Sequence, residues 1–167
     1  MSDIVNYDLT GTDSISEAVK TLLNSCPFLD EGETVSFASL QETGGIAFYP
    51  TGGAVVLNER RSITDHISQE CLYNFAIVNR SYGQNERRKM TAKEFTDSIG
   101  KWLERQSVSV GGALYKLESY PDLTGGREIR SISRQSSATL DATTEDQSEL
   151  WVINMRLTYR NEYDEQL

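Results

Sequence analysis

Residues 71–78 read Cys-Leu-Tyr-Asn-Phe-Ala-Ile-Val, and this stretch decides the fold. In an extended chain Tyr73, Phe75 and Ile77 point to one face, and the residues between them point to the other. Both faces are largely apolar, which is typical of a central strand. We expect a strand over 69–80 that helices cover on one face and a partner or a loop covers on the other.

A first amphipathic helix is predicted from Ser14, well before this strand. Ser14 and Glu17 have the spacing of a capping box, in which the hydroxyl accepts from the third helical amide and the glutamate reaches back. Pro27 ends the helix because it disfavours helical geometry in the residue before it. One helical face collects the apolar residues Ile15, Ala18, Val19, Leu22, Leu23 and Cys26. This face must be buried against another element.

A second helix is predicted after the strand, from Thr91. Thr91 and Glu94 form another capping box, and Met90 with Phe95 stand where a hydrophobic staple needs them. Its apolar stripe consists of Ala92, Phe95, Ile99, Trp102 and Leu103. Gly100 weakens this helix mildly. We expect the helix to pack beside the first one on one face of the sheet.

Shorter extended patterns supply the remaining strands. The runs 45–49 and 54–57 flank Pro50-Thr51-Gly52-Gly53 and predict a hairpin. Three further strands are predicted at 34–40, 127–134 and 149–160. Residues 107–126 are expected to form a glycine-containing connection, and 135–147 an exposed loop or arm.

These elements predict an α+β fold, in which a mainly antiparallel sheet of four to five strands carries two helices on one face. The chain has 167 residues, which is enough for one domain to bury a core. That domain is expected over 14–160. Residues 1–13 are predicted to be an N-terminal segment, and 161–167 an acidic, frayed C-terminal tail.

The chain is acidic, with a formal net charge of -9 and a pI near 4.6, so it repels nucleic-acid phosphates at long range. Its basic clusters, Arg60-Arg61 and Arg87-Arg88-Lys89, are flanked by carboxylates or polar residues and are interpreted as solvated turns. Sequence-specific nucleic-acid recognition is therefore not expected. No stretch approaches the ~20 apolar residues that span a bilayer, and the first residues lack a signal-peptide pattern. We expect the cytoplasm of the cell that makes the protein.

The sequence offers no motif for catalysis or for a cofactor. His66 is the one histidine, and it lacks a nearby Cys or His at ligand spacing, so we interpret it as a surface turn residue. The carboxylates between 141 and 149 lack the pattern of a calcium loop. The paired glycines lack the residues of a phosphate loop, and no serine lies in a Gly-x-Ser-x-Gly turn. We expect a protein that is not an enzyme and binds neither metal nor cofactor.

The two cysteines, Cys26 and Cys71, are expected to be buried thiols, with a disulfide as the alternative. The last predicted strand carries Arg156 and Arg160 beside Trp151 and Tyr159. Arginine and aromatic residues are enriched at the energetic centres of protein interfaces. Tyrosine on a strand is equally typical of a core, so both interpretations of this strand stay open.

Four blocks of the sequence, taken in order, resemble a known family. They are Gly45–Gly53 (Gly-Ile-Ala-Phe-Tyr-Pro-Thr-Gly-Gly), Glu70–Arg80 with Phe75-Ala76-Ile77-Val78, the helix end Ile99-Gly100-Lys101-Trp102-Leu103, and Leu150–Tyr159 with Arg156-Leu157-Thr158-Tyr159. Over 14–160 their order and spacing are similar to those of the minor capsid protein family, the tail terminators of long-tailed bacteriophages. The resemblance implies an α+β fold and carries no catalytic residue.

The resemblance also implies a ring, usually hexameric, that caps the finished tail tube and joins it to the head connector. Its expected partners are the tail-tube protein and the head–tail connector proteins, with DNA only passing through the lumen and no membrane. The expected location is the head-proximal end of the tail in the virion, after assembly in the host cytoplasm. Another head–tail connector, a tail-tube subunit and a soluble acidic protein-binding module are the alternatives.

For a ring subunit we expect intersubunit contacts from exposed sheet edges and loops. The hairpin tip 49–54 or the arm 135–148 would reach the tail tube or the connector. The candidate interface residues are Tyr49, Thr51, Arg60, Arg61, Arg87, Arg88, Arg156 and Arg160.

Overall fold

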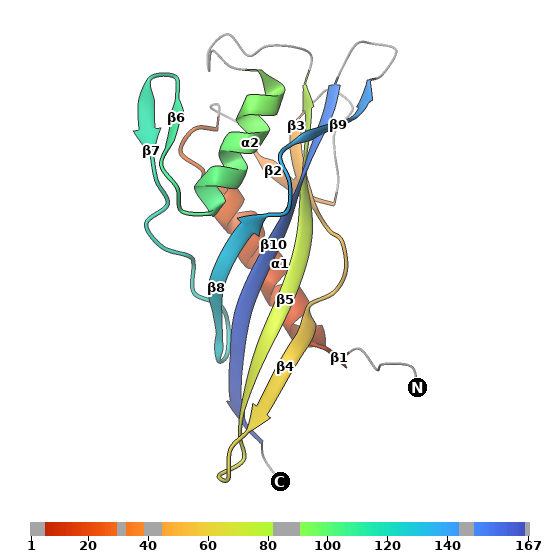
Figure 1. The fold of residues 1–167 in the computed structure, drawn as a ribbon, viewed down its shortest axis with the longest axis vertical. Helices are drawn as coiled ribbons and strands as arrows, with labels where there is room; N and C mark the ends of the chain where they lie inside the picture. Colours follow the sequence, from red (N-terminus) through yellow and green to blue (C-terminus); the bar gives the residue numbers. More distant parts are fainter. Residues whose placement is uncertain (1–5, 30–32, 39–44, 82–90, 144–148, 166–167) are drawn as a thin grey trace.

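The computed structural model describes residues 6–29, 33–38, 45–81, 91–143 and 149–165 (Figure 1). In chain order the elements are β1 (Asn6–Tyr7), α1 (Leu9–Asn24), β2 (Val35–Phe37), β3 (Gly45–Pro50), β4 (Val55–Arg61), β5 (His66–Ser81), α2 (Ala92–Leu103), β6 (Val108–Val110), β7 (Ala113–Tyr115), β8 (Arg127–Arg134), β9 (Thr139–Thr143) and β10 (Glu149–Asp164). The predicted α+β class is confirmed. The main sheet has eight strands rather than four to five, and β6 with β7 forms a separate two-stranded sheet.

Strands β5 and β10 form the spine of the sheet. Each is 16 residues long, and they pair antiparallel over their whole length, from His66 opposite Asp164 to Ser81 opposite Glu149. Such strands span about 50 Å, which is longer than either helix. In Figure 1 their lower parts run with β4 as a ribbon beyond the helices. The prediction of a central strand over 69–80 is confirmed, and the strand extends past both predicted ends.

The predicted hairpin across Pro50–Gly53 is wrong. β3 pairs with the upper half of β5 and β4 with its lower half, both antiparallel, so they follow one another along the same side of β5. Residues 51–54 make a break in this course, where the amide of Thr51 still donates to the carbonyl of Asn74 at 3.0 Å. The hairpin turn lies instead at 62–65, between β4 and β5.

Three segments predicted to lack regular structure contain strands. β10 continues to Asp164, so the prediction of a frayed tail is wrong for residues 161–164. The connection 107–126 holds the β6–β7 hairpin, whose turn is Gly111-Gly112 with φ of 61° and 85°. The expected loop or arm 135–147 holds β9, which pairs with β10. The strand predicted at 127–134 is confirmed as β8.

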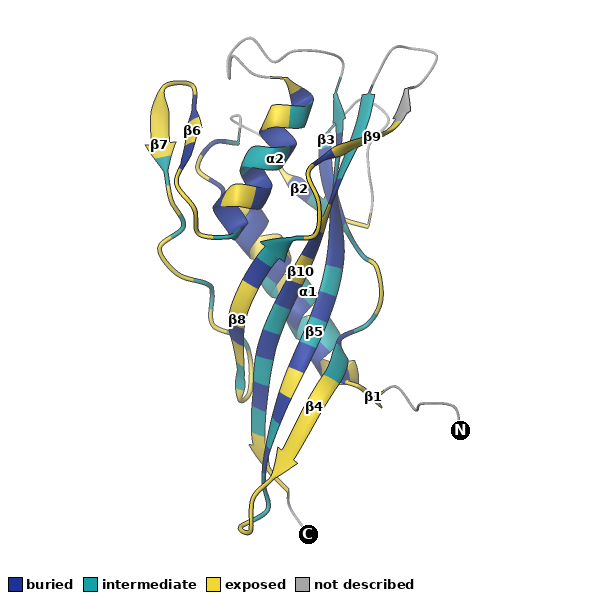
Figure 2. Ribbon diagram, viewed as in Figure 1, coloured by how far each residue is buried: buried dark blue, intermediate teal, exposed yellow. Residues whose placement is uncertain are grey.

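Both helices cover the same face of the sheet, as predicted. The side chains of alternate residues in β5 and β10, which are opposite one another in register, form a core with the apolar stripes of both helices. The hydroxyls of Ser16 on α1 and Tyr73 lie 2.8 Å apart, and Asn79 donates to Thr96 on α2 at 3.2 Å. Figure 2 shows the resulting alternation of buried and more exposed residues along β5 and β10.

Helix α1 begins at Leu9, so the predicted helix start at Ser14 is wrong. Asp8 is the N-cap, and its carboxylate accepts from the Gly11 amide at 3.1 Å. The same carboxylate accepts two hydrogen bonds from Arg127 and one from the Tyr159 hydroxyl. The Ser14 hydroxyl instead lies 2.7 Å from that of Thr124. A local cap at Asp8 therefore starts the helix, and a long-range ion pair with Arg127 holds the capping carboxylate.

Helix α2 starts as predicted, because the Thr91 side chain accepts from the Glu94 amide. The expected staple residue Met90 lies outside the described residues. Gly100 faces the sheet, and a Cβ atom built on it would lie 2.7 Å from Cδ of Arg134 and 2.8 Å from Cδ1 of Ile153. The glycine therefore lets α2 approach the sheet closely.

Neither Cys26 nor Cys71 forms a disulfide, and both are buried, which confirms the expected thiols. In the part of the chain that the structure describes, neither helix is long and apolar enough to cross a membrane.

Replacing Asp8 with Asn tests the ion pair at the start of α1. Burial alone would raise the pKa of Asp8, but hydrogen bonds from Arg127 and Tyr159 hold it below the usual 3.8. The charged form thus stabilises the fold above pH ~4, and this contribution is lost as pH falls through the lowered pKa of the folded state. We expect the variant to lose about 2 kcal/mol of unfolding free energy at pH 7. Urea unfolding from pH 7 to 3 should show the difference shrinking with pH; a constant difference contradicts this account.

Replacing Gly100 with Ala tests the close approach of α2. Helix propensity alone would stabilise the variant by about 1 kcal/mol. Because the added methyl would collide with Arg134 and Ile153, we expect a net loss of about 1 kcal/mol in thermal or urea unfolding. Lys101→Ala, at an exposed position of the same helix, is the control and should change stability by less than about 0.5 kcal/mol. A more stable Gly100→Ala variant would contradict the close packing.

Candidate interaction surface

The described residues contain no group of three or more His, Cys, Asp or Glu side chains that could hold a metal ion. His66 is the first residue of β5, so its predicted position in a turn is wrong. Its Nδ1 is 2.9 Å from a carboxylate oxygen of Asp164, and its Nε2 is 4.0 Å from one of Glu162. All three side chains are at least two-fifths exposed at the end of the ribbon, which is a surface position.

The buried polar cluster of Asp8, Arg127, Tyr159 and Cys71 links α1 to the sheet. Burial and the hydrogen bond to Asp8 raise the pKa of the Tyr159 hydroxyl far above its usual range, so it stays protonated and donates. Burial raises the pKa of the Cys71 thiol to about 11. The carboxylate of Asp8 is fully used by Gly11, Arg127 and Tyr159. The cluster therefore has a structural role, because it connects the start of α1 to β8 and β10.

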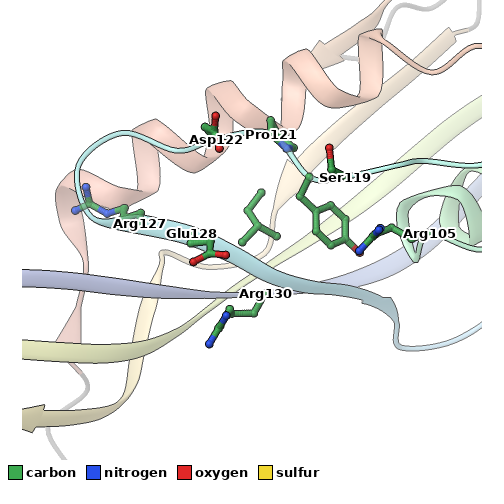
Figure 3. A pocket seen from close by; sticks show the side chains of 9 residues that line it. Arg105, Ser119, Pro121, Asp122, Arg127, Glu128 and Arg130 are labelled. Carbon is green, nitrogen blue, oxygen red and sulfur yellow. The ribbon is translucent and has the colours of Figure 1, made fainter.

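One hollow of about 320 Å³ is lined by three arginines, Arg105, Arg127 and Arg130 (Figure 3). Arg127 is bound to Asp8, and Arg105 donates to the carbonyls of Leu117 and Glu118. Figure 3 shows Arg105 and Arg127 at opposite ends and Arg130 on the other side of β8. Because the three guanidinium groups do not converge, this hollow does not form an anion-binding cup.

The most distinctive surface is the sheet face without helices, which we call the open face. It consists of the alternate residues of β5 and β10 that point away from the core, with their neighbours on β3, β4 and β8. Apolar side chains on it stay only half-buried: Tyr49, Val55, Leu72, Val78 and Val152. The second apolar face that the stretch 71–78 predicts is therefore real, and helices do not cover it.

Four of the eight predicted interface residues lie on the open face, spread along its length: Tyr49, Arg60, Arg156 and Arg160. Arg61 points to the other face, where it forms ion pairs with Glu165 and Asp65. Thr51 lies in the exposed break between β3 and β4, and not at a hairpin tip. Arg87 and Arg88 are outside the described residues.

Two β-bulges shape the open face. Leu57 is the extra residue of β4 and Arg130 that of β8, and the two bulges adjoin the cross-strand pair Cys71–Tyr159 from opposite sides. Both bulge residues line a second hollow of about 320 Å³ on this face, together with Glu70, Cys71, Thr158, Tyr159 and Arg160. Bulges often re-aim side chains at functional positions.

The arginines of the open face differ in their partners. Arg160 lies between Glu70 on β5 and Glu128 on β8 in register, and 3.8 Å from Glu162. Arg156 is exposed, and its cross-strand neighbours are the uncharged Asn74 and Ser133. Within the described part of the chain, Arg156 and Arg130 have no ion-pair partner. The open face thus carries charges of both signs, and Arg130 and Arg156 are two of its cations that no described carboxylate neutralises.

The sequence patterns did not predict the bulges at Leu57 and Arg130, because a bulge leaves little local signal in a short alternating run. The three consecutive apolar residues at 55–57 are the one indication that the alternation of β4 breaks there. No protein-family model matches the chain, and no curated protein matches it either.

A pair of alanine variants separates interface arginines from structural ones. Arg134 donates to Glu104 at 2.7 Å in a largely buried ion pair, so Arg134→Ala should lower the unfolding free energy by about 1–3 kcal/mol. Arg156→Ala removes no hydrogen bond or ion pair among the described residues, and we expect a change below about 0.5 kcal/mol. Urea unfolding of both variants checks this, and a large loss in Arg156→Ala would show that this arginine stabilises the fold.

Proposed function

We propose that this protein is a phage tail terminator, a ring subunit that caps the completed tail tube and joins it to the head connector. The order of its sequence blocks resembles that family. The arrangement of two helices on one face of a mainly antiparallel sheet agrees with the fold that the resemblance implies.

The observation that carries the proposal is the open face. Antiparallel sheets commonly turn a polar face to water, but here the face without helices keeps Tyr49, Val55 and Leu72 half-buried beside the exposed Leu57. Contiguous exposed apolar surface marks sites of protein association. A subunit of an assembly needs such a face.

The charge of the protein suits a ring through which DNA passes. With a net charge of -9 the chain repels phosphates over most of its surface, so DNA would move through the lumen without binding to it. In this function the ring does not act on the DNA and requires neither a metal nor a catalytic residue.

Deletion of the coding sequence from a phage that carries it tests this function. We expect the lysate to contain heads and tails that have not joined, with tails of abnormal length in negative-stain electron micrographs. Supplying the wild-type chain from a plasmid should restore joined particles. Normal tails joined to heads in the deletion lysate would refute the proposal, and particles without any tail would favour a tail-tube subunit.

A further inference from the structure

We propose that the open face of one copy binds an acidic groove on the helix side of a second copy, so that copies associate head to tail. The groove lies between the outer side of α1 and the segment 121–124. The inference rests on the proposed function in one respect, because a terminator must close into a ring.

The acidic groove is built from two segments that lie side by side. Its lining residues are Ser14, Glu17, Ala18, Thr21, Pro121, Asp122, Leu123 and Thr124, which enclose about 240 Å³. Glu17 and Asp122 are exposed carboxylates, and none of the described residues that line the groove is basic. Ala18, Pro121 and Leu123 give it an apolar floor on which the stem of a long side chain can lie.

The chemistry of the groove matches that of the open face. Arg156 and Arg130 are exposed and lack ion-pair partners among the described residues. An arginine combines an apolar stem with a planar guanidinium that binds carboxylates in two-pronged fashion, and both parts find a counterpart beside Glu17 and Asp122. The half-buried apolar side chains of the open face would be covered by the same contact.

Charge also argues for two different surfaces in contact rather than one surface in contact with itself. A two-fold contact between two open faces would bring Arg130 and Arg156 of both copies, which lack ion-pair partners among the described residues, into one interface, where like charges repel. Contact between an open face and an acidic groove pairs opposite charges instead. Such heterologous contacts leave one free surface of each kind at the two ends of a row of copies, so they propagate, and they form a ring when the rotation between neighbouring copies closes.

A charge-swap experiment on the full chain tests the inference. The open-face variant is Arg130→Glu with Arg156→Glu, and the groove variant is Glu17→Lys with Asp122→Lys. The control is Lys101→Glu with Lys116→Glu, which changes the net charge as the open-face variant does, at exposed lysines outside both surfaces. Circular dichroism verifies that each variant is folded, and light scattering with sedimentation velocity measures association over a range of concentrations.

We expect the wild type and the control to form closed oligomers, and each swapped variant alone to associate about 100-fold more weakly. Mixing the two swapped variants should restore assembly, because each new surface again faces its opposite charge. A wild type that stays monomeric at every concentration, swapped variants that associate like the wild type, or a mixture that fails to recover would overturn the inference. If the wild type forms rings but the mixture of swapped variants does not, the inference about the two surfaces fails and the proposed function stands. If the wild type forms rings but deletion of its coding sequence leaves phage tails normal, only the proposed function is refuted.

Discussion

The pairing of β5 with β10 is the constraint on which the rest of the structure depends. Sixteen residues of each strand pair without a break in register, which keeps their alternate side chains on common faces over the whole length. Every other strand of the main sheet is joined to this pair directly or through one neighbour. The core on one side and the open face on the other are two consequences of this single ladder.

A second constraint ties the helices to that ladder. Asp8 caps α1 and binds Arg127 on β8 and Tyr159 on β10, so one buried carboxylate joins a helix start to two strands. On α2 the absence of a side chain at Gly100 has a comparable effect, because it sets how near the helix comes to Ile153. These contacts hold both helices tightly against one face of the sheet, so neither helix covers the open face.

The parts of the fold that sequence patterns predicted are those with local causes. The cap at Thr91 depends on residues three positions apart, and the core of β5 on the alternation of residues 71–78. The start of α1 was missed although its cap is also local, because Ser14 and Glu17 have the spacing of a competing capping box inside the helix. The glycines at 52–53 suggested a hairpin because paired glycines are common in hairpin turns. Instead β3 and β4 both pair with β5, and this pairing depends on residues far away in the sequence. The apolar second face was visible in the sequence, while the bulges at Leu57 and Arg130 were not.

The late position of β10 in the chain has a consequence for how the protein is made. His66 pairs with Asp164, 98 residues further on, so the central ladder cannot form until nearly the whole described chain has left the ribosome. Contacts of such high sequence separation slow folding. During that interval the free edge of β5 and the apolar helix stripes face water, which makes the nascent chain prone to aggregate and a substrate for chaperones.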